Sequence, residues 1–242
     1  MQETPMGTRR RPKFRPIAYG LAFLFCAIGS ASAEDAKATY PAMAPVAQYQ
    51  MATVADETAL ARSAAPTSIS GDADVLTLGS NGYKTAVTGK NGFGCLVQRS
   101  WAAGFDDAEF WNPKLRAPIC FNPAAVRTVL PGYLERTQWV LAGISKSGMI
   151  DRTRIALNAN TFVAPEPGAM SFMMSKQGYL TDADGHWHPH LMFFVAHTDA
   201  AAWGANLRGS PIIAAQSDPE PITTFFIPVT KWSDGTPDVM EK

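Results

Sequence analysis

Apolar residues in this chain gather in short runs separated by turn-forming residues, a pattern typical of β-strands. Three such runs lie close together at residues 75–79, 83–87 and 93–98. The segments between them contain Asn and Gly, which readily adopt the backbone conformations of tight turns. The spacing therefore predicts an antiparallel meander of three strands.

A second group of apolar runs occupies the last third of the chain. Phe225, Phe226 and Ile227 form the most apolar stretch and are expected in the core. Turn residues again separate the runs, which predicts further short strands. These runs lie at residues 169–174, 190–196, 212–215 and 222–229.

Helical signals fill the segment between the two groups of strands. Asn122 followed by Pro123 is typical of a helix N-cap and first helical position. We expect Pro131 to begin another helix, Gly148 to end it, and residues 149–157 to form a third. The predicted fold class is α+β, with antiparallel strands at about 73–99 and 169–229 and a central helical segment at about 122–158.

The N-terminus has the pattern of a cleavable secretory signal at residues 1–33. Five basic residues precede an apolar run at 17–28, and Ala31-Ser32-Ala33 supplies a small-residue cleavage site. The alternative is a membrane anchor, but a spanning helix needs roughly twenty apolar residues and this run is shorter. The pattern predicts a periplasmic or secreted protein.

The mature chain is predicted to contain a single domain with an extension at each end. Residues 34–72 are Ala-rich and are expected to form a helix, over 46–64, and a linker. Residues 73–230 form the α+β domain, and residues 231–242 form a polar tail. No later run approaches the length of a membrane-spanning helix, so we expect no transmembrane anchor after cleavage.

Charge argues against nucleic-acid partners. The chain has 21 basic and 21 acidic residues, of which five basic and one acidic belong to the expected signal. The mature balance is 21 − 5 = 16 basic against 21 − 1 = 20 acidic residues, and this gives no basic excess to neutralise phosphates. Sequence motifs of serine hydrolases and nucleotide-binding proteins are also absent, so catalytic residues stay unknown and no cofactor-binding residue is assigned.

Two cysteines would remain after cleavage, because Cys26 belongs to the signal. Cys95 and Cys120 form an even pair in an oxidising compartment, which predicts a structural disulfide. A reactive thiol or a metal pair is the alternative, but neither cysteine has a CxxC partner or a nearby histidine. The bridge would enclose a loop that contains Trp101, Phe105, Phe110 and Trp111.

All four histidines lie within twelve residues: His186, His188, His190 and His197. Imidazole is a common transition-metal ligand, and on a strand two histidines one residue apart point to the same face. The cluster suggests a metal site for zinc or copper, with His188 as its centre, either His186 or His190 as its partner and His197 as a third ligand. Alternatively, the His-Trp-His-Pro segment caps a strand, and its rings bond to backbone carbonyls.

The sequence therefore supports two functional hypotheses for an exported protein. The first is transition-metal binding through the 186–197 cluster, with or without catalysis. The alternative is a non-enzymatic envelope module that binds a small ligand or a protein partner and has structural histidines. In that case aromatic residues such as Trp101, Trp111 and Trp187 would form the pocket or partner surface.

Two segments resemble exported bacterial proteins of uncharacterised activity. One is the Asn-Gly-Phe-Gly-Cys segment at 91–95, which is followed by Cys120, and the other is the Gly-His-Trp-His-Pro-His-Leu-Met-Phe-Phe segment at 185–194. The resemblance implies export. It transfers no catalytic residue, because no activity is associated with that group.

Overall fold

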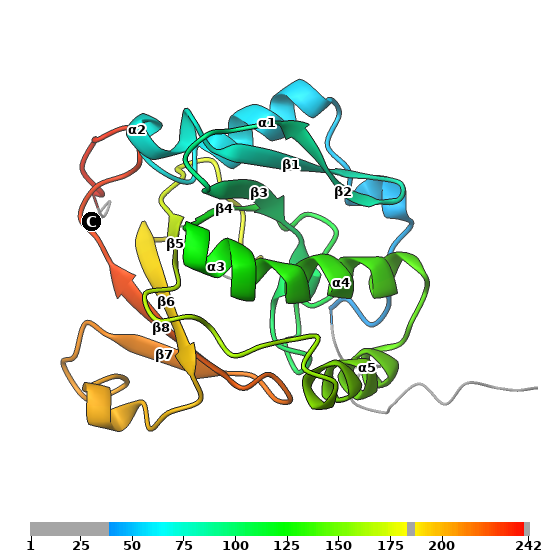
Figure 1. Ribbon diagram of the computed structural model, residues 1–242. Coiled ribbons are helices and arrows are strands. Elements are labelled where there is room, and N and C mark those ends of the chain that lie inside the picture. Colours follow the sequence, from blue (N-terminus) through cyan, green and yellow to red (C-terminus); the bar gives the residue numbers. More distant parts are fainter. Residues whose placement is uncertain (1–38, 183–186, 240–242) are drawn as a thin grey trace, which may run out of the picture. The chain divides into compact units, whose positions relative to one another are not determined.

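The structure is a computed structural model that describes residues 39–182 and 187–239 (Figure 1). The expected signal at 1–33 lies outside these residues and stays a prediction. Within the described ranges, no helix is long and apolar enough to cross a membrane.

Eight strands form one sheet in the order β2-β1-β3-β4-β5-β6-β8-β7, and every neighbouring pair is antiparallel except β1 and β3. The predicted α+β class is confirmed. The strands are β1 (Asp74–Gly79), β2 (Gly82–Val87), β3 (Gly94–Gln98), β4 (Ala117–Phe121), β5 (Met170–Met173), β6 (His190–Ala196), β7 (Ile213–Gln216) and β8 (Ile222–Pro228).

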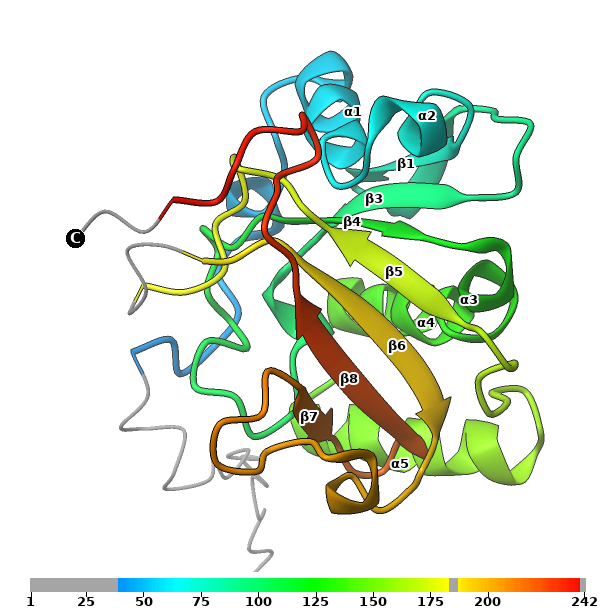
Figure 2. The same ribbon diagram turned by 90° about the vertical axis from the view of Figure 1, so that its left-hand side faces the viewer.

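The α-helices of the described chain cover different parts of the two sheet faces. They are α1 (Val54–Arg62), α2 (Thr67–Ser70), α3 (Pro123–Thr128), α4 (Leu130–Leu141) and α5 (Lys146–Asn158). In Figure 2, α4 and α5 lie behind β6 and β8, whereas α1 and α2 lie at the top beside β1 and β3.

Alternation along the strands divides the apolar residues into two cores. Val75, Cys95 and Val97 join Leu60 and other residues in and near α1 in the smaller core. The residues next to them on the strands point to the opposite face of the sheet. There, Leu96, Ile119 and Phe121 pack in the larger core with residues of α3 and α4. Because successive side chains of a strand point to opposite faces, each strand residue packs against the helices on one face of the sheet.

The predicted meander is wrong at its third strand. β1 and β2 form the expected antiparallel hairpin, but β3 runs parallel to β1 on the opposite side from β2. Residues 88–93 carry the chain back to the start of β1, where Lys90 N–H donates to the Asp72 carbonyl at 2.7 Å. Gly89 permits this return, because a Cβ there would overlap the backbone at Asp72 and Ala73.

Strand β4 was not predicted, yet it joins the two predicted groups of strands into one sheet. It pairs with β3 on one side and with β5 on the other. All five of its residues are buried, so it lacks the polar alternation that marks a strand with one exposed face. Pro118 further weakens its strand pattern.

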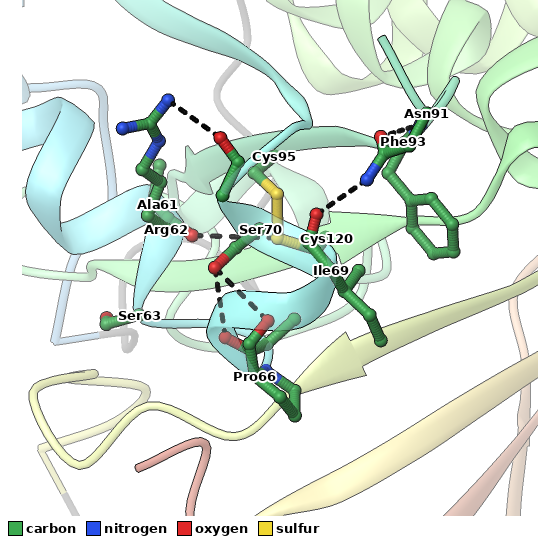
Figure 3. Close-up of a disulfide and its surroundings, with 12 residues drawn as sticks. Ala61, Arg62, Ser63, Pro66, Ile69, Ser70, Asn91, Phe93, Cys95 and Cys120 are labelled. Atoms are coloured by element: carbon green, nitrogen blue, oxygen red, sulfur yellow. Dashed lines mark hydrogen bonds between the residues drawn. A yellow bond between two sulfur atoms is a disulfide. The ribbon is translucent and has the colours of Figure 1, made fainter. Parts of the chain in front are cut away.

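The predicted disulfide is confirmed between the directly paired residues Cys95 and Cys120, whose Cα atoms are 4.0 Å apart. The bridge lies on the α1 side of the sheet, where the Cys120 sulfur is 3.8 Å from the Ala61 carbonyl (Figure 3). It encloses the 99–116 connection, and Trp101 and Phe110 of that connection are fully buried.

Helix boundaries follow their capping residues. The Asn122 side chain accepts a hydrogen bond from the Ala125 amide at 3.0 Å, which confirms the N-cap of α3. The predicted stop at Gly148 is wrong, because Gly148 lies inside the first turn of α5 and its amide is capped by Ser145. The chain instead leaves α4 through Gly143, whose φ of 72° favours glycine.

Segments on both sides of the central domain also pack against it. Tyr49 is fully buried and its hydroxyl donates to the Trp111 carbonyl at 2.8 Å. After β8, Trp232 is buried and the Ser233 amide donates to the Met174 carbonyl at 2.9 Å. Both segments therefore contribute to the same folded unit.

Removing the disulfide should destabilise the fold without changing it. A Cys95→Ala/Cys120→Ala variant frees a loop spanning 25 residues, and the chain-entropy model gives a loss of roughly 3–4 kcal/mol in the free energy of unfolding. Urea unfolding measures the loss. A reductant should lower the stability of the wild type and leave the variant unchanged. Two free thiols in the unreduced, denatured protein would contradict the bridge.

Candidate functional site

A cavity of about 610 Å³ lies between the sheet and the layer that contains α4. Its floor consists of alternate residues on four strands, which share one face of the sheet. Apolar side chains dominate this floor, and His190 and Thr224 are its polar members. The floor residues are Ala117, Ile119 and Phe121 of β4, Met173 of β5, His190, Met192 and Phe194 of β6, and Ile222, Thr224 and Phe226 of β8.

The opposite wall is built from the helices. Pro131, Gly132 and Tyr133 of α4 line it, together with Leu157 of α5 and Phe162 after that helix. A Cβ added at Gly132 would have the Phe162 ring at 3.9 Å as its nearest contact. The missing side chain at Gly132 therefore widens the cavity.

The connection between β3 and β4 forms a side wall through residues such as Ser100, Ala102 and Ala103. Its aromatic residues have another role. Trp101 and Trp111 belong to the hydrophobic core, and neither they nor Trp187 are among the described lining residues. The three tryptophans suggested by the sequence thus support the fold around the cavity and do not form its surface.

Each cation among the described lining residues is paired with a carboxylate. Arg99 lies 2.8 Å from Glu57, and Arg127 lies 2.6 Å from Glu166. Arg136 pairs with Glu220 and also donates to the carbonyls of Trp101 and Ala103. The positive charges at this site are therefore already neutralised by the protein.

Arg136 connects three parts of the cavity wall. It projects from α4, is almost fully buried, and lies 4.3 Å from the centre of the Phe105 ring. Its ion pair reaches Glu220 in the connection between β7 and β8. This contact holds the helix, the 99–116 connection and the last strands together at one border of the cavity.

Ser100 presents a buried hydroxyl to the site. The residue is fully buried and lines the cavity, and no described residue hydrogen-bonds its Oγ atom. Leaving a buried hydroxyl unpaired costs about 1–3 kcal/mol. A bound molecule or water could remove this penalty.

His190 is the histidine that lines the cavity. Its Nδ1 lies 2.8 Å from the His188 carbonyl, and its ring packs edge-on against Trp187 and near Phe226. Burial lowers the pKa of the His190 imidazole from its ordinary value of 6.5. The ring is therefore held in its uncharged form near neutral pH.

The structure separates the other histidines. His188 Nδ1 lies 2.6 Å from Asp238, whose side chain is 8% exposed. His197 follows the far end of β6, seven residues from His190, which corresponds to roughly 23 Å along a strand. His197 and His190 therefore do not share an ion, and His186 lies outside the described residues.

Among the residues that the structure describes, no group of three His, Cys, Asp or Glu side chains could hold a metal ion. The contact between His188 and Asp238 still resembles the carboxylate–histidine pairs that orient metal-binding imidazoles. Zinc or copper binding centred on His188, with His186 or His190 as its partner, stays a prediction.

Sequence reasoning missed most of the cavity. Ser100, Gly132, Arg136 and Glu220 come from distant segments and belong to no motif. The sequence could have predicted only the residues of β6 and β8, because the alternation of side chains along a strand places Met192, Phe194 and Phe226 on one face. Which face would enclose a cavity depended on where α4 packs.

No protein-family model matches the chain, and neither a curated protein nor a solved structure matches it. The resemblance to exported bacterial proteins therefore stays a prediction. Functional inference for this chain rests on the geometry of the site.

The metal hypothesis predicts that the purified protein binds zinc or copper and that His188→Ala weakens this binding at least tenfold, as for loss of a metal-site contact. Competition with a chromophoric chelator measures the affinity. The matched control is His197→Ala, at the far end of β6, which should leave the affinity unchanged. Equal affinities of the wild type and His188→Ala would contradict the hypothesis.

Proposed function

We propose that this protein is an exported binding protein that holds a small, apolar and uncharged molecule in the cavity between β4–β8 and α4. The observation that carries the proposal is the cavity itself. Its volume of about 610 Å³ falls within the range of about 300–1,000 Å³ that is typical of small-molecule sites.

A space of this size differs from a packing defect. Protein interiors are filled almost as densely as organic crystals, and voids larger than a water molecule are few. Here both walls are fixed by other contacts, since the disulfide joins β3 to β4 and the Arg136–Glu220 pair ties α4 to the last strands. The walls therefore cannot collapse easily to fill the space, and an apolar ligand would restore the missing contacts.

The composition of the walls supports an uncharged ligand. Met192, Phe194 and Phe226 offer apolar surface, whose burial favours binding by roughly 25 cal/mol per Å². Arg99 and Arg136 already have carboxylate partners, so an anionic ligand would have to compete with Glu57 or Glu220. An anionic ligand would lose its hydration without gaining a free counter-charge.

Export is the second part of the proposal. It is supported by the pattern of residues 1–33 and by the Cys95–Cys120 disulfide, because such bridges persist in oxidising compartments. An exported binding protein meets small apolar molecules outside the cytoplasm.

The export proposal predicts a mature protein that begins at Glu34. Intact-mass measurement of protein recovered from the periplasm or the culture medium should give the mass of residues 34–242 with one disulfide. The control is the same protein produced without residues 1–33, which should stay in the cytoplasm. An exported product that retains Met1 to Ala33 would contradict the cleavage.

The binding proposal predicts that the uncharged dye N-phenyl-1-naphthylamine binds saturably and fluoresces more strongly in the apolar cavity. Gly132→Leu should weaken this binding about tenfold or more, because the leucine side chain would occupy part of the cavity. A Cβ atom at this position has the Phe162 ring, at 3.9 Å, as its nearest contact. Thermal stability should be kept or raised, since leucine favours the helix more than glycine.

The matched control is Glu135→Leu, on the exposed surface of the same helix. It adds the same side chain outside the cavity and should leave the dye affinity unchanged. Absence of saturable binding to the wild type would overturn the binding function. Equal affinity of the wild type and a folded Gly132→Leu variant would show that the dye binds elsewhere and would equally overturn the assignment to this cavity.

A further inference from the structure

We propose that the cavity selects apolar molecules that carry an uncharged hydrogen-bond donor, such as a hydroxyl group, and that Nε2 of His190 accepts this hydrogen bond. The inference rests on the proposed function and adds the chemical class of the ligand. It follows from the way the His190 ring is held.

The proton position on the uncharged ring is fixed by its backbone partner. The partner of His190 Nδ1 is the carbonyl oxygen of His188, at 2.8 Å. A carbonyl oxygen can only accept a hydrogen bond, so Nδ1 carries the proton. In an uncharged imidazole the other nitrogen, Nε2, then has a lone pair and can only accept.

Packing holds this acceptor in place. The His190 ring meets Trp187 edge-on, with ring centres 5.6 Å apart, and its centre is 5.8 Å from that of Phe226. Met173 is its direct partner on the neighbouring strand β5. These neighbours restrict rotation of the ring, so the orientation of the acceptor is set before a ligand binds.

The surroundings of His190 make this acceptor selective. Met173, Met192 and Phe226 also line the cavity and offer no strong hydrogen-bond donor. A ligand without a donor would cover Nε2 with apolar surface and leave it unpaired, whereas a ligand with a hydroxyl group would satisfy it. Sites built to pair with a polar group discriminate against analogues that lack that group.

The positions of the charged lining residues restrict the chemical class of the donor further. Arg99, Arg127 and Arg136 are each paired with a carboxylate. The lining carboxylates Asp107 and Glu109 belong to the connection between β3 and β4, where Asp107 accepts a hydrogen bond from the Glu109 amide at 2.7 Å and Glu109 accepts one from the Asn112 side-chain amide at 2.5 Å. An ammonium donor would need a free counter-charge in the apolar part of the cavity, where the lining residues near His190 are Met and Phe. An uncharged hydroxyl needs none.

The test compares 2-naphthol with 2-methoxynaphthalene, which has the same ring system but no donor. Each compound displaces N-phenyl-1-naphthylamine at pH 8, where an imidazole with an ordinary pKa is uncharged. We expect the wild type to bind 2-naphthol about tenfold more tightly than the ether, the effect of roughly one hydrogen bond.

Two substitutions at His190 locate the effect. His190→Phe removes the acceptor, so this variant should bind 2-naphthol and 2-methoxynaphthalene with about equal affinity. His190→Gln supplies an amide oxygen and should retain part of the preference. His197→Phe, at the far end of β6, is the matched control and should keep the full preference. If His190→Phe does not fold, His190→Gln and the wild-type comparison still decide the result.

Each other outcome has a distinct meaning. If the dye binds and both naphthalenes displace it equally well from the wild type, the inference is overturned while the binding function stands. If Ser100→Ala abolishes the preference and His190→Phe keeps it, the buried Ser100 hydroxyl is the partner and the assignment to His190 is wrong. If neither the dye nor the naphthalenes bind, the proposed function itself has failed.

Discussion

The buried ion pair between Glu57 and Arg99 connects the α1 side of the sheet to the α4 side. The pairing between β1 and β3 ends at Leu76 and Leu96, and beyond these residues the two strands no longer pair with each other. Glu57 accepts from the Leu78 amide at 3.1 Å, and Arg99 donates to the Val97 carbonyl and, at 2.6 Å, to the Tyr49 carbonyl. Removing one partner of such a pair typically costs about 3–5 kcal/mol, because the other charge is left buried and alone.

The same pair links the fold to the cavity. Arg99 lines the cavity on one side of the sheet and binds Glu57 of α1, and its own backbone amide donates a hydrogen bond to the Tyr133 hydroxyl of α4 at 2.9 Å. Dense packing and the disulfide therefore fill the α1 side, while the α4 side is held open by fixed polar contacts. A rigid, apolar cavity of this kind is suited to bind a ligand whose shape matches its preformed walls.

The sequence predicted those elements whose signals are local. Asn122 and Pro123 begin α3 as expected, because capping depends only on neighbouring backbone groups. The run at 190–196 coincides with β6, since its apolar residues are bounded by Pro189 and the polar residues after Ala196. Strand β4 escaped prediction because it is buried on both faces. The direction of β3 escaped it because a connection's path depends on contacts made elsewhere.

By itself, the sequence determined the α+β class, most strand and helix positions and the pairing of Cys95 with Cys120, since periodicity, caps and cysteine count are properties of short segments or of composition. Only the tertiary structure decided which residues surround the cavity. Ser100, Gly132 and His190 are far apart along the chain, and they meet because α4 packs across a sheet that β4 makes continuous. It also separated His190 from His197, because an extended strand places neighbours in sequence far apart in space.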